Sequence, residues 1–518
     1  MYRARFTLFA LALLCGGAIG RADDAAAKSD AKPAAADAES KDKADELVTT
    51  RHFAVIGDQR VEYTATAGTL PMKSDDGKTK ADMFFVAYTR DGVEDMRERP
   101  ITFCFNGGPG SSSVWLHLGM VGPKRVKLNS DATPISPPYE VIDNAHSLLD
   151  LTDLVMIDPV STGYSRAAAG EDKKQFHGYE QDIASVAQFI FLYTTRFDRW
   201  LSPRFLLGES YGGIRAAGLS GYLQERYNME LNGIVFISSV IDFQTLRFDG
   251  GNDLPYVLFL PSYAATAWYH KALADDLLDL PLDELVAEVK TFAERDYAYA
   301  LSRGDALPAT QRAAVLRRLA RYTGLSEEYL DRADLRVEMP AFGKELLRDR
   351  RRTVGRFDSR YMGIDRDVNG QYIEHDPSGS ALFGPFTAAL YDYMRGELKF
   401  ERDIPYEILT GNVQPWDYDP FENRYVTAAN TLREAMTKNP FLRVHVANGY
   451  YDLATPVATI EHTFDHLGLD PTLRGHVDMS FYEAGHMMYV HEPSLEKLKR
   501  ELTGFYHEAV ASSEEAAD

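Results

Sequence analysis

Cysteine is nearly absent from this chain, since only Cys15 and Cys104 occur among its 518 residues. Two cysteines cannot build a disulfide scaffold or a cysteine-based zinc finger. The fold must therefore be held together by its hydrophobic core. A hydrophobic fraction of 45% and a charged fraction of 26% fit an ordinary globular protein and argue against a mainly disordered chain.

Basic residues are outnumbered by acidic residues. The chain has 56 lysines and arginines against 77 aspartates and glutamates, which gives a formal net charge of −21. An electric field of that sign repels a polyanion, so we do not expect nucleic acid as a partner. The short basic cluster Arg348–Arg352 is typical of ordinary protein surface.

The apolar run near the start of the chain, Phe6–Leu14, is too short to cross a bilayer, which takes about 20 apolar residues. Two arginines precede this run, and Gly20-Arg21-Ala22 has the small-x-small pattern of a cleavage site. We therefore expect residues 1–22 to be a secretory signal peptide. This predicts a periplasmic or secreted protein that has no membrane span in its mature form. An uncleaved N-terminal anchor helix is the alternative.

Shifts in composition divide the rest of the chain. Residues 23–49 consist mainly of Ala, Asp and Lys and cannot bury enough surface to offset the entropy of ordering, so we expect a disordered tether. Residues 50–240 and 401–508 are predicted to be two parts of one domain, separated by a helical insertion, or cap, over residues 241–400. The acidic residues 509–518 are expected to form a loose tail.

Both parts of this domain contain strand patterns. Tyr179–Tyr193 has apolar residues at helical spacing and lies between two predicted strands. Such alternation of strands and helices is typical of a parallel sheet. The sequence thus predicts an α/β fold with a mostly parallel central sheet and a helical insertion. Strands are predicted at Phe53–Ile56, Val61–Thr66, Met83–Tyr88, Ile101–Phe105, Leu151–Ile157, Arg204–Leu207, Leu442–Ala447 and Val477–Tyr482.

The pentapeptide Gly208–Gly212 (GESYG) follows the predicted strand Arg204–Leu207 and precedes a helix start that is rich in small residues. A G-x-S-x-G sequence between a strand and a helix is typical of a nucleophile elbow. The two glycines permit a sharp turn that lifts the hydroxyl of Ser210 out at the carboxyl edge of the sheet. Ser210 is therefore the candidate nucleophile.

A nucleophilic serine needs a base and a group that orients the base. Asp452 follows the predicted strand Leu442–Ala447, and His486 lies in a short loop before the last predicted helix. The chain order Ser, Asp, His is the order found in α/β hydrolases. An aspartate in a turn and a histidine in a loop each have an ordinary structural explanation, but the two together favour a catalytic triad.

A glycine-rich loop, Asn106–Gly110 (NGGPG), comes directly after the predicted strand Ile101–Phe105. Such a loop exposes backbone N–H groups which, with the N–H of the residue after the nucleophile, can hold a tetrahedral oxyanion. A phosphate-binding loop is the competing interpretation. It is disfavoured because neither the Gly-Lys-Ser/Thr sequence nor the G-x-G-x-x-G spacing occurs here.

These motifs belong to five longer blocks, FNGGPGSSS (105–113), IDPVSTGYS (157–165), GESYGG (208–213), NGYYDLATP (448–456) and EAGHMMYVHEP (483–493). In these blocks and in their order the chain resembles the serine carboxypeptidases. The resemblance implies an α/β-hydrolase fold with Ser210 as nucleophile, Asp452 as orienting acid and His486 as base. It also implies that the backbone N–H groups of Gly108 and Tyr211 form the oxyanion hole.

The same resemblance implies a substrate-binding role for Asn106 and Glu209, which match the residues that bind the C-terminal carboxylate of the peptide in this family. A carboxylate that faces Glu209 forms a like-charge pair, so one of the two must hold a proton. The shared proton favours an acidic working pH. The alternative for Glu209 is an acid stabilised by the dipole at a helix N-terminus.

The chain departs from the family pattern at two positions. Ser111 stands where the family has a cysteine after the glycine-rich loop. Met120 stands where the family often has a second acid that assists carboxylate binding. These differences resemble those of a divergent bacterial branch of the family.

Other patterns are weaker. Asp365–Gly370 resembles the start of a calcium-binding loop, but its twelfth position is Asp376, and we expect a polar Asn-Gly hairpin instead. His462 and His466 have the spacing of zinc ligands but lack a third ligand, so we expect a solvated helix face and no metal site. The aromatic residues that could either line a substrate cleft or pack in the core are Trp115, Tyr263, Tyr450 and Tyr451.

These observations predict an exported serine carboxypeptidase that hydrolyses peptides with a free C-terminus through a Ser-His-Asp triad and an acyl-enzyme. No cofactor is implied. The first alternative is an esterase or acyltransferase that uses the same triad. The second alternative is a non-catalytic envelope protein that uses the insertion as a docking surface.

Overall fold

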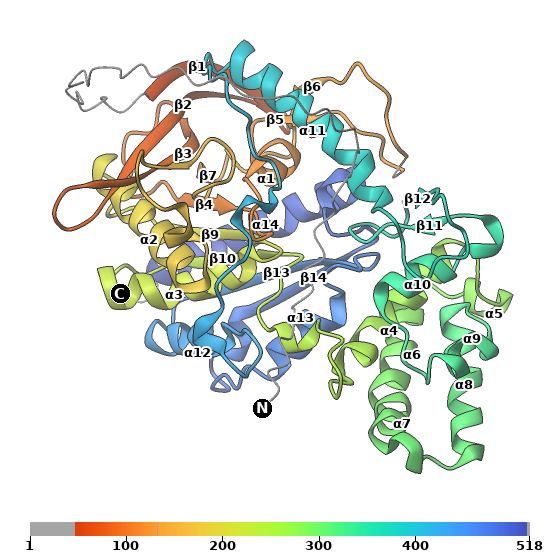
Figure 1. The fold of residues 1–518 in the computed structure, drawn as a ribbon. Helices are drawn as coiled ribbons and strands as arrows, with labels where there is room; N and C mark the ends of the chain where they lie inside the picture. Colours follow the sequence, from red (N-terminus) through yellow and green to blue (C-terminus); the bar gives the residue numbers. More distant parts are fainter. Residues whose placement is uncertain (1–46, 132, 515–518) are drawn as a thin grey trace, which may run out of the picture.

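The computed structural model describes residues 47–131 and 133–514 (Figure 1). The predicted signal peptide, residues 1–22, lies outside the described residues, as does the predicted tether up to residue 46. None of the helices in the described part of the chain is both long and apolar enough to span a bilayer.

Two boundaries predicted from composition are wrong. Residues 47–49 belong to β1 (Leu47–Ile56), not to a tether, because β1 pairs along its whole length with β2 (Gln59–Lys73). Helix α14 (Glu492–Glu514) continues through much of the segment predicted as a loose tail, 509–518, since Ala509 packs in the core at 1% exposure. In both cases apolar residues of the segment make tertiary contacts, since Leu47, Val48 and Val510 pack against the hydrophobic cores.

A ten-stranded sheet forms the centre of the molecule (Figure 1). The pairings among β1, β2, β3 and β7 are antiparallel, whereas β7 and the strands beyond it pair in parallel. Every residue of β4, β7 and β10 is buried, as expected for parallel strands covered on both faces. In sheet order the strands are β1, β2, β3 (Thr79–Arg90), β7 (Asp153–Ile157), β4 (Ile101–Phe105), β9 (Arg204–Glu209), β10 (Gly233–Ile237), β13 (Arg443–Gly449) and β14 (Val477–Tyr482), and β8 (Arg166–Ala167) pairs with β3 outside this order.

The predicted α/β architecture with a mostly parallel sheet is confirmed. The predicted strands overlap β1, β2, β3, β4, β7, β9, β13 and β14, and the predicted helix corresponds to α2 (Tyr179–Arg196). Strand β10 was not among the predicted strands. Its sequence, GIVFI, is an unbroken apolar run of the kind that a buried parallel strand requires.

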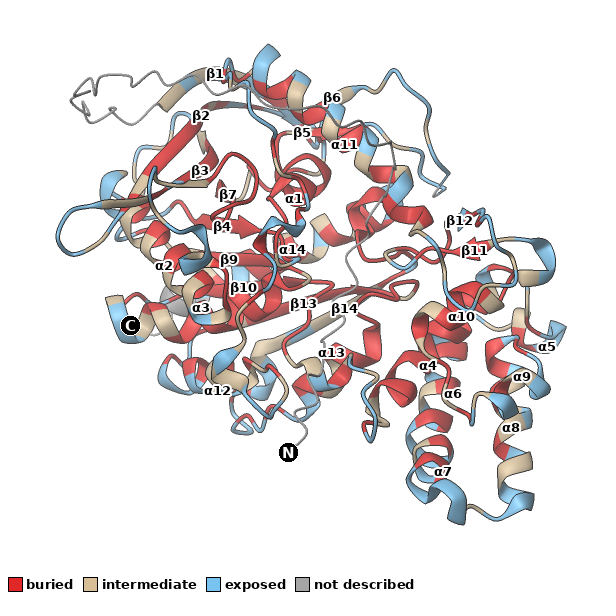
Figure 2. Ribbon diagram, in the orientation of Figure 1, coloured by how far each residue is buried: buried red, intermediate tan, exposed pale blue. Residues whose placement is uncertain are grey.

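Alternate residues of the parallel strands pack into two hydrophobic cores, one on each face of the sheet. The strands at the centre of the sheet are coloured as buried in Figure 2. In β9, Leu206 belongs to one core, while Phe205 and Leu207 belong to the other. The Phe205 ring packs on Tyr506 of α14, with 4.4 Å between ring centroids. Helices α1 (Val114–Leu116), α11 (Pro377–Gly396) and α14 cover the face with Phe205, and α2, α3 (Gly212–Tyr227), α12 (Ala429–Lys438) and α13 (Val457–Asp465) contribute to the other core.

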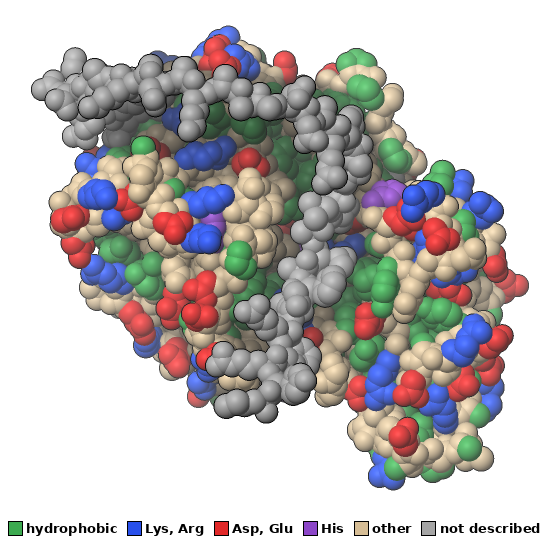
Figure 3. All heavy atoms as spheres, in the orientation of Figure 1, with side chains coloured by type: hydrophobic (Ala, Val, Ile, Leu, Met, Phe, Trp, Pro, Cys, Tyr) green, Lys and Arg blue, Asp and Glu red, His purple; other side chains and the backbone are tan. Residues whose placement is uncertain are grey.

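Residues 254–354 of the segment predicted as an insertion, 241–400, form a helical lobe beside the sheet, with a hydrophobic core of their own (Figure 1). The predicted end of the insertion at residue 400 is wrong, because α11 and the residues after it pack in the core of the sheet through side chains such as Phe386 and Phe400. Leu453, which follows Asp452, is part of the lobe core, so the lobe is anchored next to a predicted catalytic loop. Acidic and basic side chains are interspersed on the lobe surface (Figure 3). The lobe helices are α4 (Leu254–Tyr269), α5 (Asp275–Leu278), α6 (Leu282–Phe292), α7 (Ala298–Arg303), α8 (Ala309–Thr323), α9 (Glu327–Arg332) and α10 (Met339–Glu345), and the short pairs β5 (Lys124–Val126) with β6 (Val141–Asp143) and β11 (Thr353–Val354) with β12 (Met362–Gly363) complete the fold.

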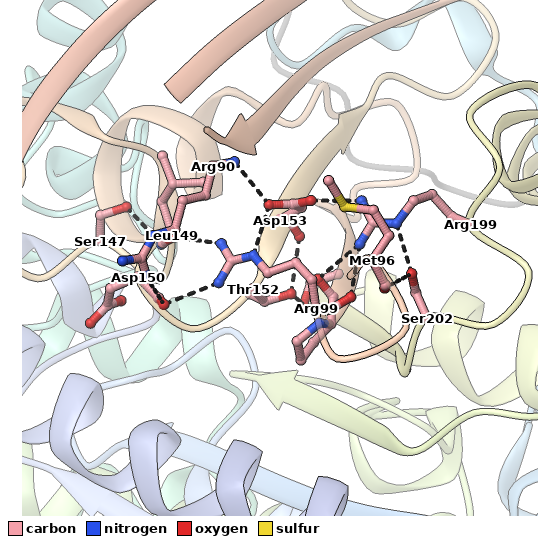
Figure 4. Close-up of polar contacts among 12 residues, drawn as sticks. Arg90, Met96, Arg99, Ser147, Leu149, Asp150, Thr152, Asp153, Arg199 and Ser202 are labelled. Carbon is pink, nitrogen blue, oxygen red and sulfur yellow. Dashed lines mark hydrogen bonds and ion pairs between the residues drawn. The ribbon is translucent and has the colours of Figure 1, made fainter. Parts of the chain in front are cut away.

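A buried cluster of ion pairs connects the segments at the amino ends of the parallel strands (Figure 4). Asp153, the first residue of β7, is 2% exposed. Its carboxylate accepts hydrogen bonds from Arg99 Nε at 3.0 Å and Arg199 Nη1 at 2.6 Å. The N–H of Arg90 donates to the same carboxylate at 3.0 Å. A buried charge needs such partners, and here they join the start of β7 to the segments before β4 and after α2.

Candidate active site

Ser210 lies on a sharp turn between β9 and α3, at the carboxyl edge of the sheet. Its φ of 63° is in the left-handed region, which only a tightly held turn imposes on serine. The Ser210 N–H donates to the Ile237 carbonyl at 3.1 Å. A Cβ on Gly208 would stand 2.3 Å from the Gly212 carbonyl oxygen, so the turn requires glycine at this position near the end of β9. The structure thus contains the strand–turn–helix geometry predicted from GESYG.

Asp452 and His486 are brought together from two loops that follow β13 and β14. Their side chains are hydrogen-bonded, with 2.8 Å between Asp452 Oδ2 and His486 Nδ1. The N–H groups of Ala454 and Thr455 donate to Asp452 Oδ1 at 2.7 and 2.9 Å, which fixes the orientation of the carboxylate. Asp452 therefore presents one oxygen to the imidazole and has the other held by the backbone.

The pKa of His486 reflects a balance of opposing effects. Burial of the ring lowers the pKa, but the charge of Asp452, its hydrogen bond to the ring and the charge of Glu209 outweigh burial. The net result is a pKa above the usual histidine value. The site thus favours the imidazolium that forms when a base takes a proton.

Ser210 and His486 line one pocket. In the described part of the chain, the Ser210 hydroxyl makes no hydrogen bond to the imidazole or to another protein group. Both residues line the same cavity, and catalytic hydrogen bonds often tighten only when the substrate is bound.

The two predicted oxyanion donors lie where the glycine-rich loop packs on the start of α3. A Cβ on Gly107 would stand 2.3 Å from the nitrogen of Tyr211, so this contact admits only glycine. Gly108 lines the pocket and has a φ of 104°, which also favours glycine. Neither the Gly108 nor the Tyr211 N–H donates to a protein acceptor within the described residues. The side chain of Tyr211 is buried away from this role, since its hydroxyl accepts a hydrogen bond from Trp416.

Asn106 and Glu209 form the buried polar end of the pocket. Burial raises the pKa of Glu209 to about 7, although His486, Tyr489 and Asn106 all act against that rise. The Tyr489 hydroxyl donates to Glu209 Oε2 at 2.7 Å. Asn106 Oδ1 accepts from the Leu116 N–H at 3.2 Å, but Asn106 Nδ2 is buried without a hydrogen-bond partner. The pocket therefore combines an unused amide donor with a carboxyl group that readily holds a proton.

A short segment that was not predicted to be functional contacts both catalytic loops. We name residues 356–360 the strap. The carbonyl of Arg356 accepts from the Leu453 N–H at 3.0 Å, and the carbonyl of Phe357 accepts from the His486 N–H at 2.6 Å. A Cβ on Gly485 would stand 2.4 Å from Asp358 Cβ. The strap thus sets the distance between the loops that carry Asp452 and His486.

The other walls of the pocket are apolar. Trp115 is one of the four aromatic residues proposed for a cleft, and it packs edge-on against Phe383 of α11 at 5.1 Å between centroids. Tyr263 instead stacks on Phe342 inside the lobe at 4.0 Å. Tyr450 and Tyr451 pack in a small cluster beside α6, outside the pocket lining. Apolar lining residues that sequence patterns did not single out are Phe357, Leu382, Phe383, Leu409 and Met487.

The segment Asp365–Gly370 is not a hairpin, since no strand follows it before α11. Lys344 Nζ donates to Asp365 Oδ2 at 2.6 Å and to the Asp367 carbonyl, and Arg348 donates to the carbonyls of Val368 and Gly370. The positive side chains of α10 and the residues after it thus hold the loop oxygens. Among the described residues, no group of three or more His, Cys, Asp or Glu could hold a metal ion.

Comparisons with known proteins find likenesses to serine carboxypeptidases. Residues 57–276 match the model of the serine carboxypeptidase family. The chain is 31% identical to the pheromone-processing carboxypeptidase KEX1 of Saccharomyces cerevisiae over 158 residues, which are 28% of this chain and 20% of that protein. It is 28% identical to serine carboxypeptidase-like 29 of Arabidopsis thaliana over 126 residues, 24% of each chain. The matches thus span only about a fifth to a quarter of these relatives.

A solved structure extends the likeness to most of the chain. The crystal structure of KEX1ΔP, a prohormone-processing carboxypeptidase from Saccharomyces cerevisiae, superposes with a TM-score of 0.53 at 17% identity. The superposition covers 86% of this chain and 91% of that chain. At this identity the likeness concerns the fold, which is that of the α/β hydrolases.

Proposed function

We propose, from the premise that residues 57–276 match the model of the serine carboxypeptidase family, that the protein removes residues from the C-termini of peptides. One observation carries the proposal. The pocket that contains Ser210 and His486 also contains Glu209, with its pKa raised to about 7, and the unpartnered Nδ2 of Asn106. A neutral carboxyl group and a free amide donor form a receptor for a carboxylate next to a nucleophile.

Ser210 attacks the carbonyl of the last peptide bond. His486 takes the hydroxyl proton, and Asp452, at 2.8 Å from Nδ1, holds the ring and stabilises the imidazolium. His486 then returns the proton to the departing amino group, which leaves an acyl-enzyme on Ser210. A water molecule, activated by the same imidazole, hydrolyses that ester.

The N–H groups of Gly108 and Tyr211 hold the negative oxygen of the tetrahedral intermediate. Because neither group has a protein acceptor within the described residues, both can turn to the oxyanion without breaking an existing bond. Preorganised donors of this type lower the barrier by about 3 kcal/mol each.

Glu209 binds the terminal carboxylate in its protonated form, with Asn106 Nδ2 as a second donor. Protonation of Glu209 is favoured below pH 7. A neutral base at His486 is favoured at higher pH, since its pKa is raised. The two requirements produce a bell-shaped pH profile, and binding of the free C-terminus weakens on the alkaline side because Glu209 becomes an anion.

Matched peptides test this function. The protein is incubated with a peptide that ends in a free carboxylate and with the same peptide as its C-terminal amide, and mass spectrometry follows the products at several pH values. We expect stepwise trimming from the C-terminus and a strong preference for the free acid. Internal cleavage, or equal rates for acid and amide, would refute the carboxypeptidase proposal.

An esterase or acyltransferase on the same triad is the second candidate. Met120, which stands where the family often has a second acid, is 2% exposed and packs in a hydrophobic core rather than lining the pocket. The carboxylate receptor therefore rests on Asn106 and Glu209. An esterase hydrolyses neutral esters without regard to a free carboxylate. A non-catalytic binding protein is distinguished by fluorophosphonate, which labels only an activated Ser210.

The proposal includes export. Residues 1–22 are proposed to act as a cleaved signal peptide that delivers the protein to the periplasm or the medium. The N-terminus of the protein recovered from those fractions tests this. A chain that retains its first residues and stays in the cytoplasm refutes it.

A further inference from the structure

Arg356 is the one lysine or arginine among the described residues that line the catalytic pocket. It comes from the strap, and its backbone is held on both sides. The Arg356 N–H donates to Asp376 Oδ1 at 3.1 Å, and its carbonyl accepts from the Leu453 N–H at 3.0 Å. Asp376 is itself the N-cap of α11. The backbone from which this side chain reaches the pocket is therefore fixed by the fold.

The guanidinium of Arg356 has no acidic partner in the described part of the chain. Its contact is with the face of the neighbouring Phe357 ring, 5.3 Å from the centroid, and the residue is exposed. Arg360, four residues further along the strap, is different. It is 6% exposed and forms two short hydrogen bonds with Asp358, of 2.9 and 2.6 Å. Within this short segment, the guanidinium of Arg360 is buried in an ion pair, whereas the guanidinium of Arg356 is exposed at the pocket and unpaired among the described residues.

An exposed cation beside the reacting groups is available to an anionic group of the substrate. Its influence on the base is small, because burial lowers the pKa of His486, Asp452 and Glu209 raise it on balance, and the charge of Arg356 adds only a minor lowering. A substrate anion bound to the guanidinium forms a charge-assisted hydrogen bond, which guanidinium–carboxylate geometry makes bidentate.

From this we infer that Arg356 is a specificity residue that selects peptides with an aspartate or glutamate side chain next to the scissile bond. The inference rests on the proposed carboxypeptidase function. The terminal carboxylate is the other possible source of the anion. It is disfavoured, because its use by an exposed arginine leaves the buried amide of Asn106 without a partner.

Paired peptides that differ only in Glu against Gln, at either residue flanking the last peptide bond, test the inference. At pH 6 and low salt we expect kcat/KM to be about three- to fivefold higher for one Glu peptide than for its Gln partner, as for a partly exposed ion pair. Arg356→Gln should bring that ratio to one, and Arg356→Glu should favour the corresponding Lys peptide. Arg366→Gln, an exposed arginine of the same insertion outside the pocket lining, is the matched control and should retain the preference.

Three results overturn the inference. They are equal rates for every Glu and Gln pair, an unchanged preference in Arg356→Gln, and a loss in that variant of the preference for free acid over amide, which would assign Arg356 to the terminal carboxylate. Each leaves peptide trimming intact, so it is distinct from failure of the proposed function. If no peptide is hydrolysed, calorimetric binding of the same pairs to Ser210→Ala decides, and a Kd ratio of one, or no binding, counts against Arg356.

Discussion

The two ends of the parallel strands use buried polar groups in opposite ways. At the amino ends, Asp153 is enclosed by Arg99 and Arg199, and both of its oxygens have partners (Figure 4). At the carboxyl ends, Asn106 Nδ2 has no partner, and burial raises the pKa of Glu209. Polar groups that are fully paired hold the fold, whereas groups left incomplete next to a cavity are available to a ligand. This agrees with the general rule that ligands of open α/β sheets bind in the crevice at the carboxyl ends of the strands.

Loss of the nucleophile is expected to have the largest effect and to fall entirely on activity. Ser210→Ala should lower kcat by a factor on the order of 10⁴ to 10⁶, since the residues of a triad act as a unit. The hydroxyl has no protein partner within the described residues, so the free energy of unfolding should change by less than about 0.5 kcal/mol. Peptide hydrolysis and urea unfolding measure the two quantities. A large loss of stability would show that Ser210 is part of the framework.

Asp153→Asn should lower the stability of the protein and leave its activity nearly unchanged. It leaves the guanidinium groups of Arg99 and Arg199 buried without a counterion, which costs about 3–5 kcal/mol of unfolding free energy. The kcat/KM of the folded fraction should stay within about twofold, because the cluster lies at the opposite end of the strands from the site. Glu328→Gln, in a surface pair with Arg332, is the control and should cost at most about 0.5 kcal/mol. Equal losses in the two variants would contradict the contrast between the two ends.

Gly485→Ala tests whether the strap positions the loop that carries His486. The added Cβ would meet Asp358 Cβ at 2.4 Å and the Phe357 carbonyl oxygen at 2.5 Å, so the loop of His486 must move. A displacement of about 1 Å at a catalytic base lowers kcat by about 100-fold. Gly475→Ala, where nothing lies within 4 Å of the new Cβ, should leave the rate unchanged. Wild-type kinetics in the Gly485 variant would remove the positioning role of the strap.

Glu209→Gln is expected to have the smallest effect on rate, about tenfold at acidic pH, but a distinct pH signature. The alkaline fall in kcat/KM near pH 7 should disappear because glutamine does not ionise.

The same substitution should change how the free energy of unfolding depends on pH. The pKa of Glu209 in the folded protein lies above its usual value of 4.5, so its bound proton stabilises the fold below pH 4.5, and this contribution is lost as the pH rises through 7. The variant should therefore gain stability relative to wild type over that range. A parallel pH dependence in both proteins would contradict the assignment.

Much of the fold and of the candidate site could be predicted from local sequence. The turn around Ser210 and the loop Asn106–Gly110 are visible in the sequence because glycines at fixed spacing are the only residues that permit those backbones. Most strands are recognisable because buried strands need apolar runs. The boundaries at residues 47–49 and at the end of α14 differ from the prediction, since pairing with β2 and packing of Ala509 are tertiary contacts that the composition of a neighbouring polar segment does not reveal.

The strap and the role of Arg356 could not be recognised from local sequence. Nothing in the local pattern separates Arg356 from Arg360, four residues away in a chain with 56 lysines and arginines. Asp358 is two residues from each arginine, but it pairs with Arg360, which is buried and also donates to the carbonyl of Glu483, more than 100 residues further along the chain. Short-range sequence thus determined the backbone turns and the identity of the reacting groups, because these depend on local sterics and chemistry. The folded arrangement alone decided which charges are buried, which are neutralised and which face the substrate, because solvation and Coulomb energies depend on distances between segments remote in sequence.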